Sequence, residues 1–141
     1  MRVTLVVKNL AFAALMASPL ALSIGSGWSA LIAPSGTKEP ATAWVLIALA
    51  SMAMTINLHL SYLRPALYAK LHNKSMEGYK PASGIPLIGS ILASIAVLVA
   101  WGKLLVAVAS LVILFADTGS VVWLFAALAG DRSFWSEPRN A

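Results

Sequence analysis

The chain has 141 residues, of which 60% are hydrophobic and only 11% are charged. An ordinary soluble domain has about 25% charged and 45–50% apolar residues, and a domain this small must leave much of its surface in contact with solvent. The composition therefore excludes a soluble globular fold and indicates a chain whose surface faces lipid. The net charge of +5 lies in short segments between apolar runs, which indicates membrane topology and not a nucleic-acid partner.

Four apolar stretches are predicted to be membrane-spanning helices, because spanning takes about 20 mostly apolar residues at about 1.5 Å rise each. In chain order they cover residues 10–32, 44–63, 85–101 and 104–129. Pro19 lies inside the first and is expected to kink it, since proline has no backbone N–H to donate. Only Gly102 and Lys103 separate the last two, which predicts an antiparallel hairpin. The predicted fold is a single all-α membrane domain over residues 1–141, a bundle of four transmembrane helices.

Lys and Arg are unevenly distributed among the segments that connect these spans. Eight of the ten lie in the N-terminal tail, the loop 64–83 and the C-terminal tail, and the other two loops hold Lys38 and Lys103. With four spans those three segments share one side, and the positive-inside rule puts that side, with both termini, in the cytoplasm. A multi-pass protein of the bacterial inner membrane is therefore predicted. One alternative stays open, because Arg2 and Lys8 followed by residues 10–22 also resemble a secretory signal peptide.

The loop 64–83 is the longest polar stretch of the chain. Leu63, Leu67 and Leu71 recur in it at helical spacing, so two interpretations stay open, a solvated loop and a short helix lying on the membrane surface. Its basic side chains are expected to face anionic lipid headgroups, each worth about 1 kcal/mol; they are Arg64, Lys70, Lys74 and Lys80.

Asp117 lies near the middle of the fourth predicted span, where a charged group costs roughly 2.5–3.5 kcal/mol. On an unbroken helix Ser110, Asp117 and Ser120 share one face, which predicts a polar stripe that faces protein. Three interpretations of Asp117 stay open: a neutral acid that hydrogen-bonds a neighbouring helix, a coupling site for protons or cations in a transporter, and a helix break at 117–120 whose exposed backbone groups bind a substrate. No Lys or Arg lies deep in a span, which favours a neutral carboxyl or a partner chain.

The second and third predicted spans also carry small and polar residues. In the third, four positions let helix backbones approach closely and are predicted to pack against the fourth span: Gly89, Ser90, Ala93 and Ser94. In the second, Ser51, Thr55 and His59 recur at spacing four, with Asn57 and Ser61 on another side. Thr55 and His59 are candidates to line a route near Asp117.

Two short segments resemble known families. The residues Asp117-Thr118-Gly119-Ser120 resemble the catalytic signature of aspartic proteases, in which a pair of Asp residues shares a proton to activate water. Here the motif occurs once and its flanks are membrane-helical, so protease activity is not predicted. The residues from Gly84 to Ser90, with the basic loop before them, are similar to small bacterial inner-membrane proteins, some of which resemble immunity partners of membrane-acting antibacterial toxins. That resemblance carries no catalytic residues.

The function predicted from these observations is non-enzymatic. The chain lacks Cys and has only two His, so no metal site, cofactor or catalytic constellation is predicted. The expected activity is helix-mediated binding of another membrane component, for example by an immunity protein against a membrane-inserting toxin or by an accessory subunit; the expected partners are the lipid bilayer and a membrane protein or further copies of the chain. The alternative is a small oligomeric ion- or proton-coupled transporter in which Asp117, Ser110 and Ser120 line the route, with Thr55 opposite.

Overall fold

A computed structural model describes residues 2–33, 36, 38–72, 76–80 and 84–130, and all regular structure in these ranges is helical. In chain order the elements are α1 (Arg2–Ile32), α2 (Ala41–Leu58), the π-helical turn η1 (His59–Leu63), α3 (Arg64–Leu71), α4 (Ile88–Val99), α5 (Leu104–Ala116) and α6 (Val121–Gly130). The prediction of an all-α fold is confirmed for this part of the chain.

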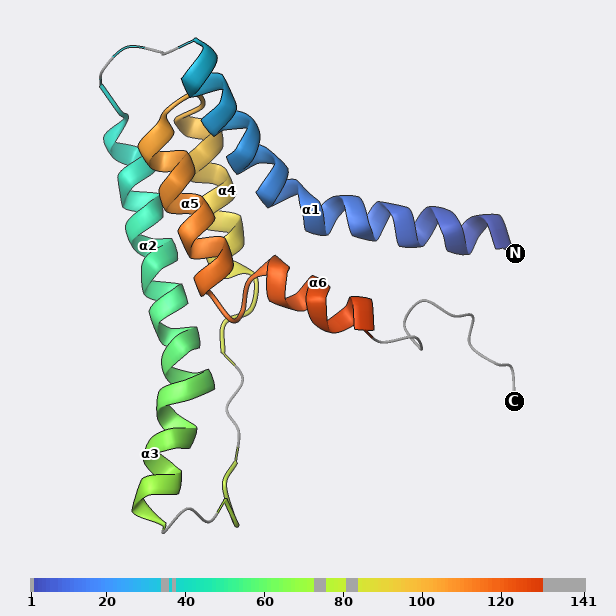
Figure 1. Ribbon diagram of the computed structural model, residues 1–141, viewed down its shortest axis with the longest axis vertical. Helices are drawn as coiled ribbons and strands as arrows, with labels where there is room; N and C mark the ends of the chain where they lie inside the picture. The colour runs from blue at the N-terminus through green and yellow to red at the C-terminus, as the bar shows by residue number, and fades with distance from the viewer. Residues whose placement is uncertain (1, 34–35, 37, 73–75, 81–83, 131–141) are drawn as a thin grey trace.

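The helices form a bundle from which two segments depart (Figure 1). α2, α4, α5 and the C-terminal half of α1 run side by side, whereas the N-terminal half of α1 and α6 leave the bundle on the same side. Pro19 lies inside α1 and withholds one backbone hydrogen bond, and Figure 1 shows α1 bent near its middle. Met16 of α1, Leu114 of α5 and Val121 of α6 form a small apolar cluster where the departing segments meet.

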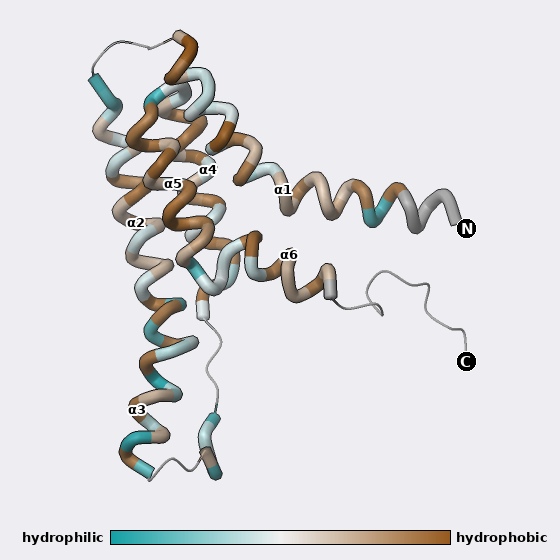
Figure 2. Tube along the Cα trace, in the orientation of Figure 1, coloured by the Kyte–Doolittle hydropathy of each residue, from teal (hydrophilic) through white to brown (hydrophobic). Residues whose placement is uncertain are grey.

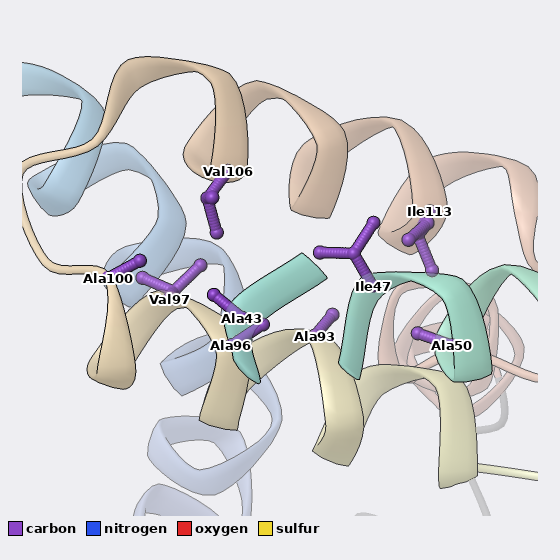
Figure 3. Close-up of a cluster of buried hydrophobic side chains, with 9 residues drawn as sticks. All are labelled: Ala43, Ile47, Ala50, Ala93, Ala96, Val97, Ala100, Val106 and Ile113. Carbon is purple, nitrogen blue, oxygen red and sulfur yellow. The ribbon is translucent and has the colours of Figure 1, made fainter. Parts of the chain in front are cut away.

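The core between α2, α4 and α5 is made largely of small side chains (Figure 3). Alanine and β-branched residues from the three helices are buried together there: Ala43, Ile47, Ala50, Ala93, Ala96, Val97, Ala100, Val106 and Ile113. Small residues let helix backbones approach closely, and close fit drives helix association in an apolar solvent. α2 and α4 consequently make the most extensive contact of any two helices in the described residues.

Two helical stretches, Val7–Ile32 and Ala41–Leu71, are long and apolar enough to cross a membrane. A third arises if the pair Leu104–Ala116 and Val121–Ala129, bent by 43°, counts as one span. The remaining apolar helix, α4, has 12 residues and measures about 18 Å, short of the roughly 30 Å hydrocarbon core of a bilayer. The structure thus supports two or three spanning helices by length and composition, where the sequence predicted four.

The second predicted span is longer than expected, because the helix continues through the beginning of the predicted loop to Leu71. Pro65 lies at the start of α3 and lacks a backbone N–H to donate. The π-helical turn precedes it: Arg64 N–H donates to His59 O, five residues back, and the wider turn accommodates the proline. α3 therefore continues along the line of α2 (Figure 1). Lys74, which was predicted to face lipid headgroups, lies outside the described residues.

The third predicted span, 85–101, is also corrected at both ends. α4 begins only at Ile88, since Leu87 has a left-handed backbone with φ 66°, and it ends at Val99. Gly102, with φ 74°, then forms the turn into α5, and Lys103 N–H donates to Ala100 O at 3.1 Å. The predicted hairpin is present as α4 and α5, which pack against each other.

Candidate functional site: a buried carboxylate where two helix breaks meet

The fourth predicted span is broken between Asp117 and Ser120. α5 ends at Ala116, Asp117 is extended with φ −74° and ψ 108°, and α6 begins at Val121. The predicted stripe on one unbroken helix is therefore replaced by a turn. Ser110, Asp117 and Ser120 are nonetheless each 0% exposed. The three predicted polar residues are therefore all buried, and each has a different hydrogen-bond partner.

The break leaves the carbonyl groups at the end of α5 without helical partners, and in apolar surroundings each must be satisfied within the protein. The last helical bond of α5 runs from the Asp117 N–H to Ile113 O at 2.8 Å. Beyond it, two side chains bond freed carbonyls: the Ser120 hydroxyl donates to Leu114 O at 2.6 Å, and the Trp123 indole N–H donates to Phe115 O at 3.0 Å. The turn itself is closed by Ser120 N–H, which donates to Asp117 O at 2.9 Å. Asp117–Ser120 is thus a helix junction held by both backbone and side-chain hydrogen bonds.

Asn57 of α2 contacts the Asp117 carboxylate directly. Its side-chain amide donates to Asp117 Oδ1 at 2.7 Å, and the Gly119 N–H donates to the same oxygen at 2.9 Å. Both side chains are buried, Asn57 at 1% exposure. The second carboxylate oxygen, Oδ2, is buried without a hydrogen-bond partner among the described residues.

Asn57 also holds a second irregular segment, the one that precedes α4. Its amide donates to Ile85 O at 3.1 Å, and its Oδ1 accepts from Ile85 N–H at 2.7 Å. The next contact along this segment joins the two breaks, since Leu87 N–H donates to Gly119 O at 2.8 Å. A left-handed backbone costs a non-glycine residue about 1–2 kcal/mol, so the strain at Leu87 is held by the surrounding contacts.

Three glycines allow the two breaks to approach each other. A Cβ at Gly84 or at Gly119 would overlap the Asn57 amide, and a Cβ at Gly89 would lie 2.5 Å from Asp117 Oδ2. The segment from Gly84 to Ser90 therefore lies against the turn at 117–120. We call this set of contacts around Asn57 and Asp117 the polar junction.

The small residues of the third predicted span take different places around the polar junction. Gly89, Ser90 and Ala93 are buried. Ser90 Oγ accepts from Val121 N–H, the first of α6, at 3.1 Å, and Ala93 O accepts from the Ser110 hydroxyl at 3.2 Å. Ser94 is half-buried, bonds Ser90 O in its own helix, and lines an apolar recess of about 310 Å³ beside Met16 and Pro19 of α1.

The structure does not bring Thr55 and His59 to Asp117. Both are exposed, and the Thr55 hydroxyl donates to Ser51 O at 2.8 Å within its own helix. Arg64, Lys70 and Lys80, which the sequence assigned to lipid headgroups, are exposed at the far end of the α2–α3 helix.

Asn57 is the site residue that sequence reasoning did not select. Spacing alone placed it on a different side from Ser51 and Thr55, whose hydroxyls both bond carbonyls four residues back in α2. A primary amide has two donors and an acceptor that its own helix does not satisfy, so an Asn in an apolar helix is a stronger signal of a tertiary contact than Ser or Thr. Ser26 of α1 was also missed; it is buried and accepts from Gly102 N–H at 3.0 Å.

A recess of about 210 Å³ opens beside the polar junction. It is lined by Asn57, Ser61, Gly84, Pro86, Thr118 and Gly119. The hydroxyl oxygens of Ser61 in η1 and of Thr118 in the turn between α5 and α6 lie 2.9 Å apart. Within the described ranges no group of three or more His, Cys, Asp or Glu side chains is placed to hold a metal ion. The arrangement can lock helices together and can present small polar groups to one face of the bundle.

Fold and site together define a class: an all-helical protein whose long apolar helices are consistent with a membrane protein and whose two helix breaks meet at a buried carboxylate. Comparison with models of known protein families, with curated proteins and with solved structures gave no match.

Proposed function

We propose that the chain is a multi-pass protein of the bacterial inner membrane, without enzymatic activity, that acts by binding another membrane component through its helices. An immunity protein against a membrane-inserting toxin and an accessory subunit of a larger complex are two forms of this function. In the proposed arrangement all four apolar stretches lie in the bilayer, with α5 and α6 as a broken span. The distribution of Lys and Arg favours both termini in the cytoplasm.

The observation that carries the proposal is that the buried polar groups are used within the chain to join its own helices. The Asn57 amide connects α2 to both breaks, and the hydroxyls of Ser90, Ser110 and Ser120 each bond backbone atoms. Beyond this junction the space between α2, α4 and α5 is filled by the apolar cluster of Figure 3. Since these groups already bond one another in the described interior, we expect a partner to bind the outward faces of the helices.

The N-terminal half of α1 (residues 7–18) and α6 supply the most distinctive of these faces; we call them the side pair. They contact each other and lead away from the bundle (Figure 1). Val7, Leu10 and Leu15 on α1 are 59–64% exposed, and Trp123 on α6 is 47% exposed. Helix association in lipid depends on close fit between helix faces, and these exposed apolar side chains offer such a face to a partner.

Site-specific photocrosslinking in native membranes tests the proposal. A photoreactive residue at Leu10 or at Trp123 is expected to crosslink one foreign membrane protein in a saturable, stoichiometric band, identified by mass spectrometry. Val45 of α2, with 59% exposure against 64% for Leu10, is the matched control and should not give this band. Equal crosslinking from all three positions, or products containing this chain alone, would contradict partner binding through the side pair.

A second function is favoured by one specific observation, the buried Asp117 Oδ2 that has no described hydrogen-bond partner. Carboxylates at broken helices in membranes are characteristic of coupling sites. This candidate is a small oligomeric ion- or proton-coupled transporter that uses Asp117. Reconstituted into liposomes, such a protein would conduct or exchange protons or cations, and Asp117→Asn would abolish the flux without lowering expression, whereas Thr55→Ala would not. Under the binding proposal the wild-type protein gives no flux above empty liposomes.

A further inference from the structure

A second recess, of about 410 Å³, opens at the far end of the α2–α3 helix, away from the polar junction. It forms where residues 76–80 lie beside α3 (Figure 1). Gly78, with φ 77°, makes the turn that allows this return, and Tyr79 N–H closes it by donating to Met76 O at 3.1 Å.

Aromatic contacts fix the wall of this recess. The Tyr68 hydroxyl of α3 donates to Glu77 O at 2.7 Å. The Tyr68 ring stacks on His72, with centroids 4.0 Å apart, and lies 5.1 Å from the Tyr79 ring. The Arg64 guanidinium carbon is 6.0 Å from the centroid of Tyr79, which is the outer range of a cation–π contact. The side chains that would bind a ligand are therefore partly pre-ordered, which lowers the entropy lost on binding.

The lining of the recess carries two basic side chains. Arg64 and Lys80 line it together with His59, and no Asp or Glu is among its lining residues. A guanidinium presents five donors in a planar fork that matches a phosphate group, and a nearby ammonium adds a point charge. The chemistry of the recess is thus that of a phosphate monoester or diester site.

Apolar side chains in the same recess indicate where that phosphate comes from. Leu67 and Leu71 also line it and are 52% and 78% exposed. Hydrophobic and hydrophilic residues alternate along α3 (Figure 2). A soluble phosphate would leave these leucines in water, whereas a phospholipid would cover them with its glycerol and upper acyl carbons.

We propose that this recess, which we call the headgroup recess, binds the phosphate headgroup of an anionic phospholipid, with Arg64 and Lys80 as its ligands. The proposal rests on the proposed residence in a membrane but not on a protein partner. The proposal assigns headgroup binding to only some of the basic residues of this region. Arg64 and Lys80 line the recess, whereas Lys70 is exposed on α3 outside it. Basic pockets at the ends of membrane helices are a known mode of headgroup recognition.

The test compares lipids and variants on the full-length protein purified in a neutral detergent. Its thermal unfolding is followed while phosphatidylglycerol or phosphatidylcholine is added. We expect phosphatidylglycerol to raise the midpoint temperature and phosphatidylcholine to have little effect. The double variant Arg64→Gln/Lys80→Gln should need about 10–30-fold more phosphatidylglycerol for half of the shift, the loss expected for two basic side chains at a headgroup. Lys38→Gln, which removes an exposed basic side chain from the opposite end of the bundle, should behave as wild type.

Several results would overturn the inference. One is an equal loss in the Lys38→Gln variant; another is an unchanged response in the double variant. A third is an equal shift with soluble glycerol phosphate, which would assign the recess to a free phosphate ester. If the double variant does not fold, the single variant Lys80→Gln is used, and an unchanged response there overturns the inference. Carbonate extraction of cell membranes separates the two proposals: release of the protein would overturn membrane residence, whereas retention without a phosphatidylglycerol preference would overturn the headgroup site alone.

Discussion

Asn57→Ala is expected to destabilise the fold more than any comparable truncation on α2. The Asn57 side chain makes three hydrogen bonds, one to the Asp117 carboxylate and two to the backbone of Ile85. It is therefore the only described side chain whose bonds join α2 to both helix breaks. Removing it leaves a buried carboxylate oxygen with a single donor, the Gly119 N–H.

The magnitude follows from these contacts. Hydrogen bonds in membrane proteins contribute about 0.6 kcal/mol each on average, so three of them give about 2 kcal/mol. Asp117 Oδ1 then has only the Gly119 N–H as donor, and the incomplete hydrogen bonding of this buried acceptor adds roughly another 1 kcal/mol to the loss. We expect a total loss of about 3 kcal/mol in the free energy of unfolding. Thr55→Ala is the matched control, because the exposed Thr55 hydroxyl bonds only Ser51 O of its own helix; it should stay within about 0.5 kcal/mol of wild type.

The assay is reversible unfolding in mixed micelles, followed by circular dichroism as the fraction of denaturing detergent rises. A double-mutant cycle with Asp117→Asn isolates the contact between the two side chains, with an expected coupling of about 1 kcal/mol. If Asn57→Ala and Thr55→Ala lie within about 0.5 kcal/mol of each other, the polar junction does not hold the breaks together and the reasoning is wrong.

Two further substitutions probe close contacts elsewhere. Gly89→Ala would place its Cβ 2.5 Å from Asp117 Oδ2 and should destabilise by about 1–3 kcal/mol, whereas Gly36→Ala, with nothing within 4 Å of the new Cβ, should be neutral in the same unfolding assay. Ser26→Ala removes the acceptor of the Gly102 N–H and should cost about 1–3 kcal/mol, with faster amide hydrogen exchange at Gly102 as its specific signature; normal protection there would refute it.

Much of the helical architecture was predictable, because it depends on runs of apolar residues. The start of α5 at Leu104 agrees with the predicted fourth span, and the turn at Gly102 gave the predicted hairpin. Helix ends that depend on tertiary contacts were not predictable. Ile85 and Leu87 read as part of an apolar span, but their backbone groups bond Asn57 and Gly119 instead of forming another helical turn.

For the polar residues too, one property could be predicted from the sequence and another could not. The burial of Ser110, Asp117 and Ser120 was predictable from the cost of exposing them to lipid, and all three are buried. Their partners were not predictable, because the helical periodicity on which the stripe was based ends at Ala116. The role of Asn57 could have been predicted from its side-chain chemistry, although not from its spacing. The hydroxyls of Ser51 and Thr55 bond carbonyls of their own helix, whereas a side-chain amide cannot make all of its hydrogen bonds there.

The turn at 117–120 gives each residue of the protease-like tetrapeptide a structural contact. Each residue of Asp117-Thr118-Gly119-Ser120 has a contact that joins helices: Asp117 accepts from Asn57, Thr118 meets Ser61, Gly119 accepts from Leu87 N–H, and Ser120 donates to the end of α5. An aspartic protease needs a second carboxylate beside the first, whereas here the neighbouring group is an amide that donates to Oδ1. Backbone groups freed by a helix break in apolar surroundings have to be satisfied within the protein; here Gly119 allows the close approach of Asn57, and the Ser120 hydroxyl bonds a freed carbonyl. These contacts account for the tetrapeptide as a junction between helices.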